Sequence, residues 1–213
     1  MKFIPIMLNV TGKKLLIIGG GKAAAQKLNN LSSKFDRIIV VADEFKEMIE
    51  GKNVETVRLH ITEPSQLDKF IERNTIVVIA SDEPELNEEI RDYCERKGVL
   101  FNSVDRRDSP FIFPAVLDSN GVIVSVSTEG KSPSLSRFLR KKISSVVNSY
   151  SCALPILEKV RNEIIATEHS TKAIYFQRLF EDDNFWKLVD KGQDDAAFTY
   201  ALNVFKTLKL KSR

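Results

Sequence analysis

The sequence predicts an α/β protein in three parts: a doubly wound parallel sheet over residues 1–110, a β-hairpin and helix over residues 111–150, and a small all-helical module over residues 151–213. Two observations lead to this prediction. Strand-like and helix-like patterns alternate through the first part at a spacing of about 25 residues, which is typical of a parallel sheet with helices on both faces. From Ser151 onward, only helical patterns follow.

The strands of the first part are predicted from short β-branched and apolar runs bounded by polar residues. These runs are Lys14–Ile18, Arg37–Val41, Val54–His60, Thr75–Ala80 and Val99–Val104. Helices are predicted between them at Lys22–Leu31, Pro64–Glu72 and from Asp82 to Gly98. For the last of these, we expect Asp82 to cap the helix, Glu85 to complete a capping box and Gly98 to end it.

The second part begins with a predicted hairpin. Its strands are Phe111–Leu117 and Val122–Ser127, and Asp118–Gly121 forms the turn. Ser132-Pro133 then predicts a helix start, with serine as the N-cap and proline in the first turn. One face of this helix carries an apolar stripe: Leu135, Phe138, Leu139, Ile143, Val146 and Val147. The stripe and the hairpin offer more apolar surface than this segment needs for itself, so we expect a homodimer.

The third part is predicted to contain only helices, at Leu154–Ile165, Ala173–Phe180, Phe185–Val189 and Ala196–Leu208.

Composition excludes several classes of protein. At 43% hydrophobic and 29% charged residues, the 213-residue chain can bury a core and is not disordered. No apolar run approaches the roughly 20 residues that span a bilayer, so we expect no membrane segment. A net charge of +3 does not favour nucleic acid as a partner. Cys94 and Cys152 lie far apart in the sequence, which indicates a cytoplasmic protein without a disulfide framework. With only two histidines and no cysteine cluster, we expect no metal site.

The sharpest motif is Gly19-Gly20-Gly21-Lys22-Ala23-Ala24, directly after a predicted strand and at the start of a helix. This is the Gly-x-Gly-x-x-Ala fingerprint of a Rossmann-type dinucleotide site. Gly19 permits a tight turn, Gly21 lets the backbone approach a pyrophosphate, and Ala24 allows close packing of helix on strand. The alternative is a glycine-rich turn without a ligand.

Acidic and polar residues follow the next strands of the predicted sheet. Asp43 and Glu44 come directly after the second strand, where an acid bonds the ribose hydroxyls and repels a 2′-phosphate, which favours NAD over NADP. The alternative for Asp43 is that it caps the next helix. Ser81 and Asp82 follow the fourth strand and are candidate cofactor contacts, although capping explains them equally well.

Asp105 closes the fifth strand and is followed by Arg106. A carboxylate at this edge of the sheet can accept a proton from a substrate. A surface salt bridge in a charged loop explains Asp105 equally well.

A basic segment surrounds the start of the helix at Ser132. Lys131 and Arg137 lie near the helix start, which Ser127 and Thr128 precede, and this arrangement suits a polycarboxylate or phosphate ligand. The alternative is a solvated basic face. Apart from Phe138, which belongs to the apolar stripe, no aromatic residue is interleaved with the basic ones between Lys131 and Lys142, which counts against nucleic acid.

Several motifs in order resemble the precorrin-2 dehydrogenases, including the N-terminal part of the siroheme synthases. The resemblance covers roughly the first 150 residues. It rests on Ile4–Leu8, Gly19–Lys27, Ala80–Asp82 with Asn87, Asn102–Asp105, Phe111–Ala115, Val124–Thr128 and Lys131–Pro133. Ser103 and Glu129 depart from the pattern, since the family usually has an apolar residue and a glycine there.

The resemblance implies oxidation of precorrin-2 to sirohydrochlorin with NAD as hydride acceptor, in siroheme synthesis. It places the essential aspartate at Asp105, cofactor contacts at Lys22, Ala23, Asp43 and Glu44, and the substrate loop at Ser127 and Thr128. Some family members also insert iron or cobalt into sirohydrochlorin. A different hypothesis is a non-catalytic NAD-binding regulatory module, which would bind NAD without turnover.

Overall fold

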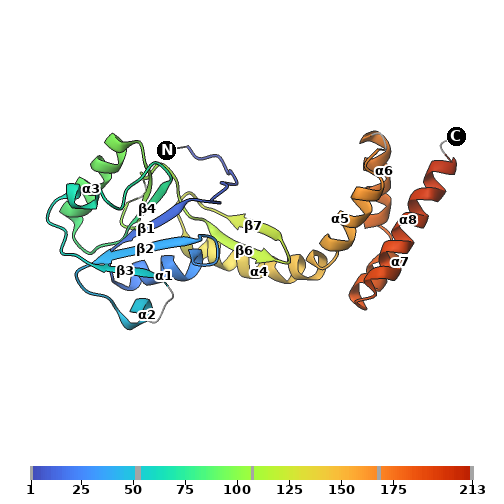
Figure 1. Ribbon diagram of the computed structural model, residues 1–213. Helices are drawn as coiled ribbons and strands as arrows, with labels where there is room; N and C mark the ends of the chain where they lie inside the picture. Colours follow the sequence, from blue (N-terminus) through green and yellow to red (C-terminus); the bar gives the residue numbers. More distant parts are fainter. Residues whose placement is uncertain (1, 51–53, 107, 167–168, 212–213) are drawn as a thin grey trace. The chain divides into compact units, whose positions relative to one another are not determined.

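The computed structural model describes residues 2–50, 54–106, 108–166 and 169–211 (Figure 1). The chain divides into two compact units, Met1–Phe113 and Pro114–Arg213. Within the described residues, no helix is both long and apolar enough to cross a membrane.

The first unit is built on a five-stranded sheet in the order β3-β2-β1-β4-β5. All of its strand pairs are parallel. The strands are β1 (Lys14–Ile18), β2 (Arg37–Ala42), β3 (Glu55–Arg58), β4 (Thr75–Ile79) and β5 (Leu100–Ser103). The predicted doubly wound parallel sheet is therefore confirmed, with strand ends that shift by a few residues at most.

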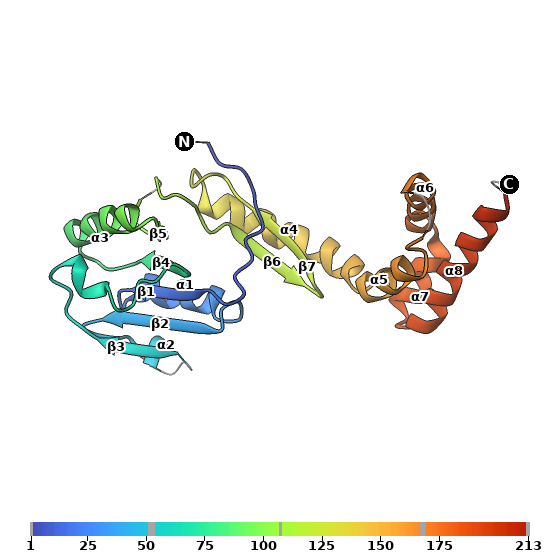
Figure 2. The ribbon, with the colours of Figure 1, turned by 45° about the horizontal axis from the view of Figure 1, so that its top comes forward.

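Helices cover both faces of this sheet, because alternate residues of each central strand enter different cores. Leu16, Val41 and Val77 belong to one core, which the helix α3 (Pro84–Lys97) covers with Ile90 and Cys94. The other core contains Leu15 and Val78 and is covered by α1 (Lys22–Leu31) and α2 (Glu47–Glu50). Figure 2 shows α1 and α3 beside the strands that they cover.

Two predicted helix features are wrong. The segment predicted as a helix at Pro64–Glu72 forms only a 3₁₀ turn at Pro64–Leu67, and its apolar pattern reflects the burial of Leu67 and Phe70 in the core. Asp82 does not cap α3, so Glu85 does not complete the predicted capping box with it. The N-cap is Glu83, which makes no side-chain cap bond, and its N–H donates to the Ser81 hydroxyl at 3.3 Å. Gly98 ends α3 in the left-handed conformation, as predicted.

The first unit ends with aromatic residues that pack into it. Phe111 and Phe113 contact its second core, and their rings meet edge to face at 5.0 Å. Asn102 donates to the Phe111 carbonyl at 3.1 Å and accepts from the Lys27 ammonium at 3.1 Å. Burial lowers the pKa of Lys27. The strand predicted from Phe111 therefore begins only at Ala115.

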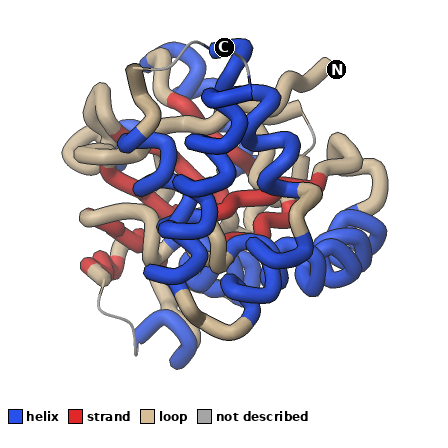
Figure 3. The backbone as a smooth tube through the Cα atoms, turned by 90° about the vertical axis from the view of Figure 1, so that its right-hand side faces the viewer, coloured by secondary structure: helices blue, strands red, loops and turns tan. Residues whose placement is uncertain are grey.

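The second unit contains the predicted hairpin, β6 (Ala115–Ser119) and β7 (Val122–Val126). Asn120 and Gly121 form its turn with φ of 49° and 86°, which asparagine and glycine tolerate best. Helices follow, as the tube in Figure 3 shows in blue. They are α4 (Pro133–Ser151), α5 (Leu154–Glu163), α6 (His169–Phe180), α7 (Asp183–Asp190) and α8 (Asp194–Lys211). The last four enclose a separate core around Tyr175 and Phe185.

Candidate functional site

The glycine loop turns away from β1 through a conformation that requires glycine. Gly19 has φ of 111°, and a Cβ there would lie 2.4 Å from the Ala80 carbonyl oxygen. A Cβ on Gly20 would lie 1.8 Å from the carbonyl oxygen of Glu44. The loop is also bonded to the segment after β2, since Gly19 N–H donates to Val41 O at 2.8 Å and Lys46 N–H donates to Gly20 O at 3.1 Å. Gly19 and Gly20 therefore fix the shape of the loop.

Gly21 has a different environment. A Cβ there would meet nothing within 4 Å, and its φ of −83° suits any residue. Gly21 is the N-cap of α1, and no described side chain caps this helix. Lys22 and Ala23 are exposed at the helix start, whereas Ala24 is buried against the sheet. Open space beside uncapped N–H groups fits the phosphates of a dinucleotide.

A small pocket continues from the glycine loop along the carboxyl ends of β1, β2 and β4. Its lining residues include Gly19, Asp43, His60, Ser81 and Glu83. The Asp43 carboxylate lies 3.7 Å from His60 Nδ1 and accepts the Glu44 N–H at 2.8 Å. Glu44 lies before α2, which begins only at Glu47, so this bond does not cap the helix. The alternative of Asp43 as a helix cap is therefore wrong. The exposed carboxylates of Asp43 and Glu44 remain available to a ligand.

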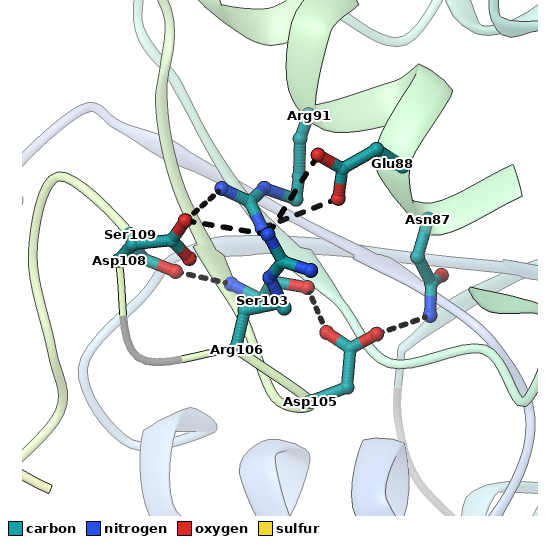
Figure 4. Close-up of polar contacts among 8 residues, drawn as sticks. All are labelled: Asn87, Glu88, Arg91, Ser103, Asp105, Arg106, Asp108 and Ser109. Atoms are coloured by element: carbon teal, nitrogen blue, oxygen red, sulfur yellow. Dashed lines mark hydrogen bonds and ion pairs between the residues drawn. The ribbon is translucent and has the colours of Figure 1, made fainter. Parts of the chain in front are cut away.

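Asp105 lies beyond the carboxyl end of β5, at the same edge of the sheet as the glycine loop. The register places Ile18, Ile79 and Ser103 side by side across β1, β4 and β5. Both oxygens of the Asp105 carboxylate accept hydrogen bonds, as Figure 4 shows. Asn87 of α3 donates to Oδ2 at 3.2 Å, and the Ser103 hydroxyl donates to Oδ1.

The loop after Asp105 is held by an ionic cluster with α3. The nearly buried Arg91 contacts Asp108 at 3.1 Å and Glu88 at 3.4 Å (Figure 4). The hydrogen bond from Arg91 keeps the pKa of Asp108 below its usual value. Arg106 contacts the same two acids at 3.6 and 3.9 Å. Among the described residues, the ion pairs made by acids of this loop belong to Asp108, whereas the hydrogen bonds to Asp105 come from the neutral side chains of Asn87 and Ser103.

The sheet and its glycine loop match a known protein family. A model described as "Putative NAD(P)-binding" matches residues 6–115, which span the whole sheet and the loops above it. The chain belongs to this NAD(P)-binding family. Open parallel sheets of this kind bind ligands at the carboxyl ends of their strands, which is the edge that carries the glycine loop here.

Relatives of this NAD(P)-binding chain include siroheme synthases and a precorrin-2 dehydrogenase. A siroheme synthase of Blochmanniella pennsylvanica is 28% identical over 95% of this chain, which spans only 44% of that relative. A precorrin-2 dehydrogenase of Methanosarcina barkeri is 26% identical, and the match covers 92% of this chain and 90% of the relative. Among solved structures, SirC, a precorrin-2 dehydrogenase, has the same fold with a TM-score of 0.70, 19% identity and coverage of 96% and 100%.

Of the remaining predicted site residues, Asp82 and Arg106 lie in the first unit, within the NAD(P)-binding match. The others lie in the second unit, outside that match. Ser127, Thr128 and Lys131 lie in the loop between β7 and α4, and Ser132 and Arg137 lie at the start of α4. Ser132 caps α4 through the Leu135 N–H at 3.3 Å, as predicted, and Thr128 accepts the Ser132 N–H at 2.9 Å. Ser127 accepts the Glu129 N–H at 3.0 Å, and the Lys131 ammonium contacts the Glu129 carboxylate at 3.0 Å. Arg137 is exposed on α4.

The backbone of the same loop is one that favours glycine at position 129, where this chain has glutamate. Glu129 has φ of 52° and precedes Gly130 at 75°, so the backbone here is left-handed at two successive residues. Glycine adopts this conformation without the penalty of roughly 1–2 kcal/mol that a side chain incurs.

Sequence reasoning missed Asn87, Ser103, Gly20 and His60 as parts of the site. For Asn87 and Ser103, a weak signal was present, because both belong to motifs that carried the resemblance. Their contacts with Asp105 join residues from different elements, which spacing along the chain does not reveal. The same holds for the approach of Gly20 to Glu44.

Proposed function

We propose that this protein oxidises precorrin-2 to sirohydrochlorin with NAD, as a step of siroheme synthesis. Membership in the NAD(P)-binding family and the names of the relatives support this proposal. The observation that carries it is the position of Asp105: an exposed carboxylate, hydrogen-bonded on both oxygens, at the sheet edge that carries the glycine loop.

The nucleotide would lie along this edge. Gly19, Gly21 and the N–H groups of Lys22 and Ala23 would hold its pyrophosphate, with Ala24 packed behind. Asp43 and Glu44 would bond the ribose, and Ser81 and Asp82 would contact the part of the cofactor that lies over β4. When bound, NAD accepts a hydride from the substrate.

The chain's own residues would handle the proton and the substrate charges. Oxidation of precorrin-2 to sirohydrochlorin removes one hydride and one proton, and the Asp105 carboxylate accepts that proton. Precorrin-2 is a polycarboxylate, so cations and hydroxyl donors are suited to bind it. We assign this role to Arg106, Ser127, Thr128, Lys131, Ser132 and Arg137.

Anaerobic incubation with precorrin-2 and NAD tests the proposal. We expect NADH and the sirohydrochlorin spectrum to appear together. NAD binding without turnover would instead favour a regulatory module. Ferrous or cobalt ion added afterwards shows whether the protein also inserts metal.

Cys94 and Cys152 are free thiols, which supports the cytoplasm as its compartment.

NAD should bind more tightly than NADP, by about tenfold or more. The reason is that the exposed Asp43 carboxylate lines the pocket where a 2′-phosphate would lie. Titration of both nucleotides by calorimetry measures the ratio. Asp43→Asn should reduce it, whereas Asp36→Asn, at an exposed position before β2, should not. Tighter binding of NADP would contradict the assignment of Asp43.

We also propose a homodimer formed through α4. Leu135, Phe138 and Val146 on its stripe are 46%, 55% and 57% exposed, and none of them belongs to a core of the described residues. Light scattering should return about twice the chain mass of 24.1 kDa. Val146→Asp should shift the protein toward monomer. Asn148→Asp adds the same charge on the polar face of α4, because residues seven apart lie on one face of a helix and Asn148 is seven residues after Lys141. This control should leave the dimer intact. A wild-type mass near that of one chain at micromolar concentration would contradict the proposal.

A further inference from the structure

A continuous set of hydrogen bonds joins the carboxyl ends of β4 and β5. It runs from Ser81 through Asn87 to Asp105 and on to Ser103. We propose that Asn87 and Ser103 are positioning residues that hold the Asp105 carboxylate in the orientation needed to accept the substrate proton. This inference rests on the proposed dehydrogenase function and deepens it.

Asn87 is placed as a fixed bridge. It lies in the first turns of α3, and only 2% of its surface is exposed. Its side-chain oxygen accepts the Ser81 hydroxyl at 2.6 Å, and its amide nitrogen donates to the Ser81 carbonyl at 3.1 Å and to Asp105 at 3.2 Å. Two bonds to Ser81 fix the amide plane, so the remaining N–H points at Asp105. A buried amide with every group used has little freedom to move.

Ser103 provides the second point of attachment. It is the last residue of β5, is 2% exposed, and its N–H donates to the buried Ser109 hydroxyl at 2.9 Å. Its own hydroxyl donates to the Asp105 oxygen that Asn87 does not contact. The departure from the family pattern at Ser103 therefore gives this chain a donor that an apolar residue lacks.

Two donors on two oxygens fix both the position and the rotation of the carboxylate. Each carboxylate oxygen can accept more than one hydrogen bond, so the outward lone pairs stay available to a substrate proton. Because Asp105 itself is exposed, it has no packing to hold it, and these two bonds replace that packing. Loss of either bond should slow proton transfer without changing how NAD binds, since misplacement of a reacting group by about 1 Å can cost up to 10²-fold.

The test uses anaerobic single-turnover rates of the full chain with NAD and saturating precorrin-2. Ser103→Ala should lower the rate roughly tenfold, and Ser103→Thr, which keeps the hydroxyl, should restore most of it. Asn87→Leu should lower it at least as much. In the Ser103 variants, the KM for precorrin-2 and the affinity for NAD should stay near wild type. Since Asn87 is buried, the Ser103 variants decide the question if Asn87→Leu does not fold.

A matched control separates positioning from stability. Thr75→Val removes a buried hydroxyl at the opposite end of β4, where Thr75 accepts the Glu72 N–H at 2.9 Å. It should lower the melting temperature and leave the rate unchanged.

A double variant gives a second test. Ser103→Ala should cause no further loss of rate in the Asp105→Asn background, because a residue that acts only through Asp105 has nothing left to position.

Two results would overturn the inference. One is a loss of rate that is equal in Ser103→Ala and Ser103→Thr and follows their melting temperatures. The other is a full additional loss in the Asp105→Asn background. If the wild-type protein does not oxidise precorrin-2, the proposed function fails separately. NMR of the Asn87 side-chain amide then tests whether Asn87 is bonded to Asp105. Asp105→Ala should shift that amide signal and speed its hydrogen exchange, whereas an unchanged signal contradicts the bridge.

Discussion

Asp105→Ala should slow the dehydrogenation step by roughly 10²–10⁴-fold, the usual contribution of a positioned acid or base. NAD should bind almost as in the wild type, because the glycine loop follows β1 whereas Asp105 follows β5. Asp105→Asn should be nearly as damaging, since an amide keeps the shape but cannot accept the proton. Anaerobic single-turnover rates, NAD titrations and melting temperatures measure these effects.

The control is Asp92→Asn, the same change at an exposed position on α3 outside the hydrogen-bonded network. It should leave the rate and the stability unchanged. A well-folded Asp105→Asn that reacts at the full rate would eliminate the general-base role. The substrate would then have to lose its proton to water or to one of its own carboxylates.

Gly21→Ala should weaken NAD binding by about thirtyfold or more, which corresponds to about 2 kcal/mol, without destabilising the fold. The new methyl group fits the free protein, because nothing lies within 4 Å of it and φ is −83°. It would project toward the position that we assign to the pyrophosphate, where it separates the phosphates from the helix N–H groups. Calorimetry and thermal melting give the affinity and the stability.

Gly20→Ala is the contrasting variant one residue away. Its Cβ would lie 1.8 Å from the Glu44 carbonyl oxygen, so the backbone must shift, and the melting temperature should fall along with NAD affinity. A Gly21→Ala protein that binds NAD normally would refute the assignment of this helix start as the pyrophosphate site.

The sheet could be predicted from sequence because its strands are buried on both faces. Runs such as Leu15–Ile18 and Ile76–Ile79 are apolar throughout, which is the pattern that parallel strands between two layers of helices require. Helix starts were harder. Asp82 looks like a cap in the sequence, but in the fold Ser81 accepts the N–H of Glu83 instead. That choice depends on Asn87, which holds Ser81 in place.

The candidate site was predictable where one short segment carries the chemistry, as in Gly19–Ala24 or at the end of a strand. It was not predictable where partners come from distant segments. Asn87 and Asp105 are 18 residues apart, and sequence spacing gives no indication that they are bonded. The residues between β7 and α4 belong to a different unit from Asp105, so their part in binding substrate stays a prediction.

The bonds between the glycine loop and the segment after β2 have a thermodynamic consequence. Gly19 donates to Val41, and Gly20 accepts from Lys46, so the segments assigned to the pyrophosphate and to the ribose form one connected piece. A nucleotide that binds such a preorganised piece does not have to order it, and little conformational entropy is lost on binding. The coupling also means that the two halves of the dinucleotide site cannot be adjusted independently. A substitution that moves the turn after β2 also moves the glycine loop, so cofactor preference should change only together with cofactor affinity.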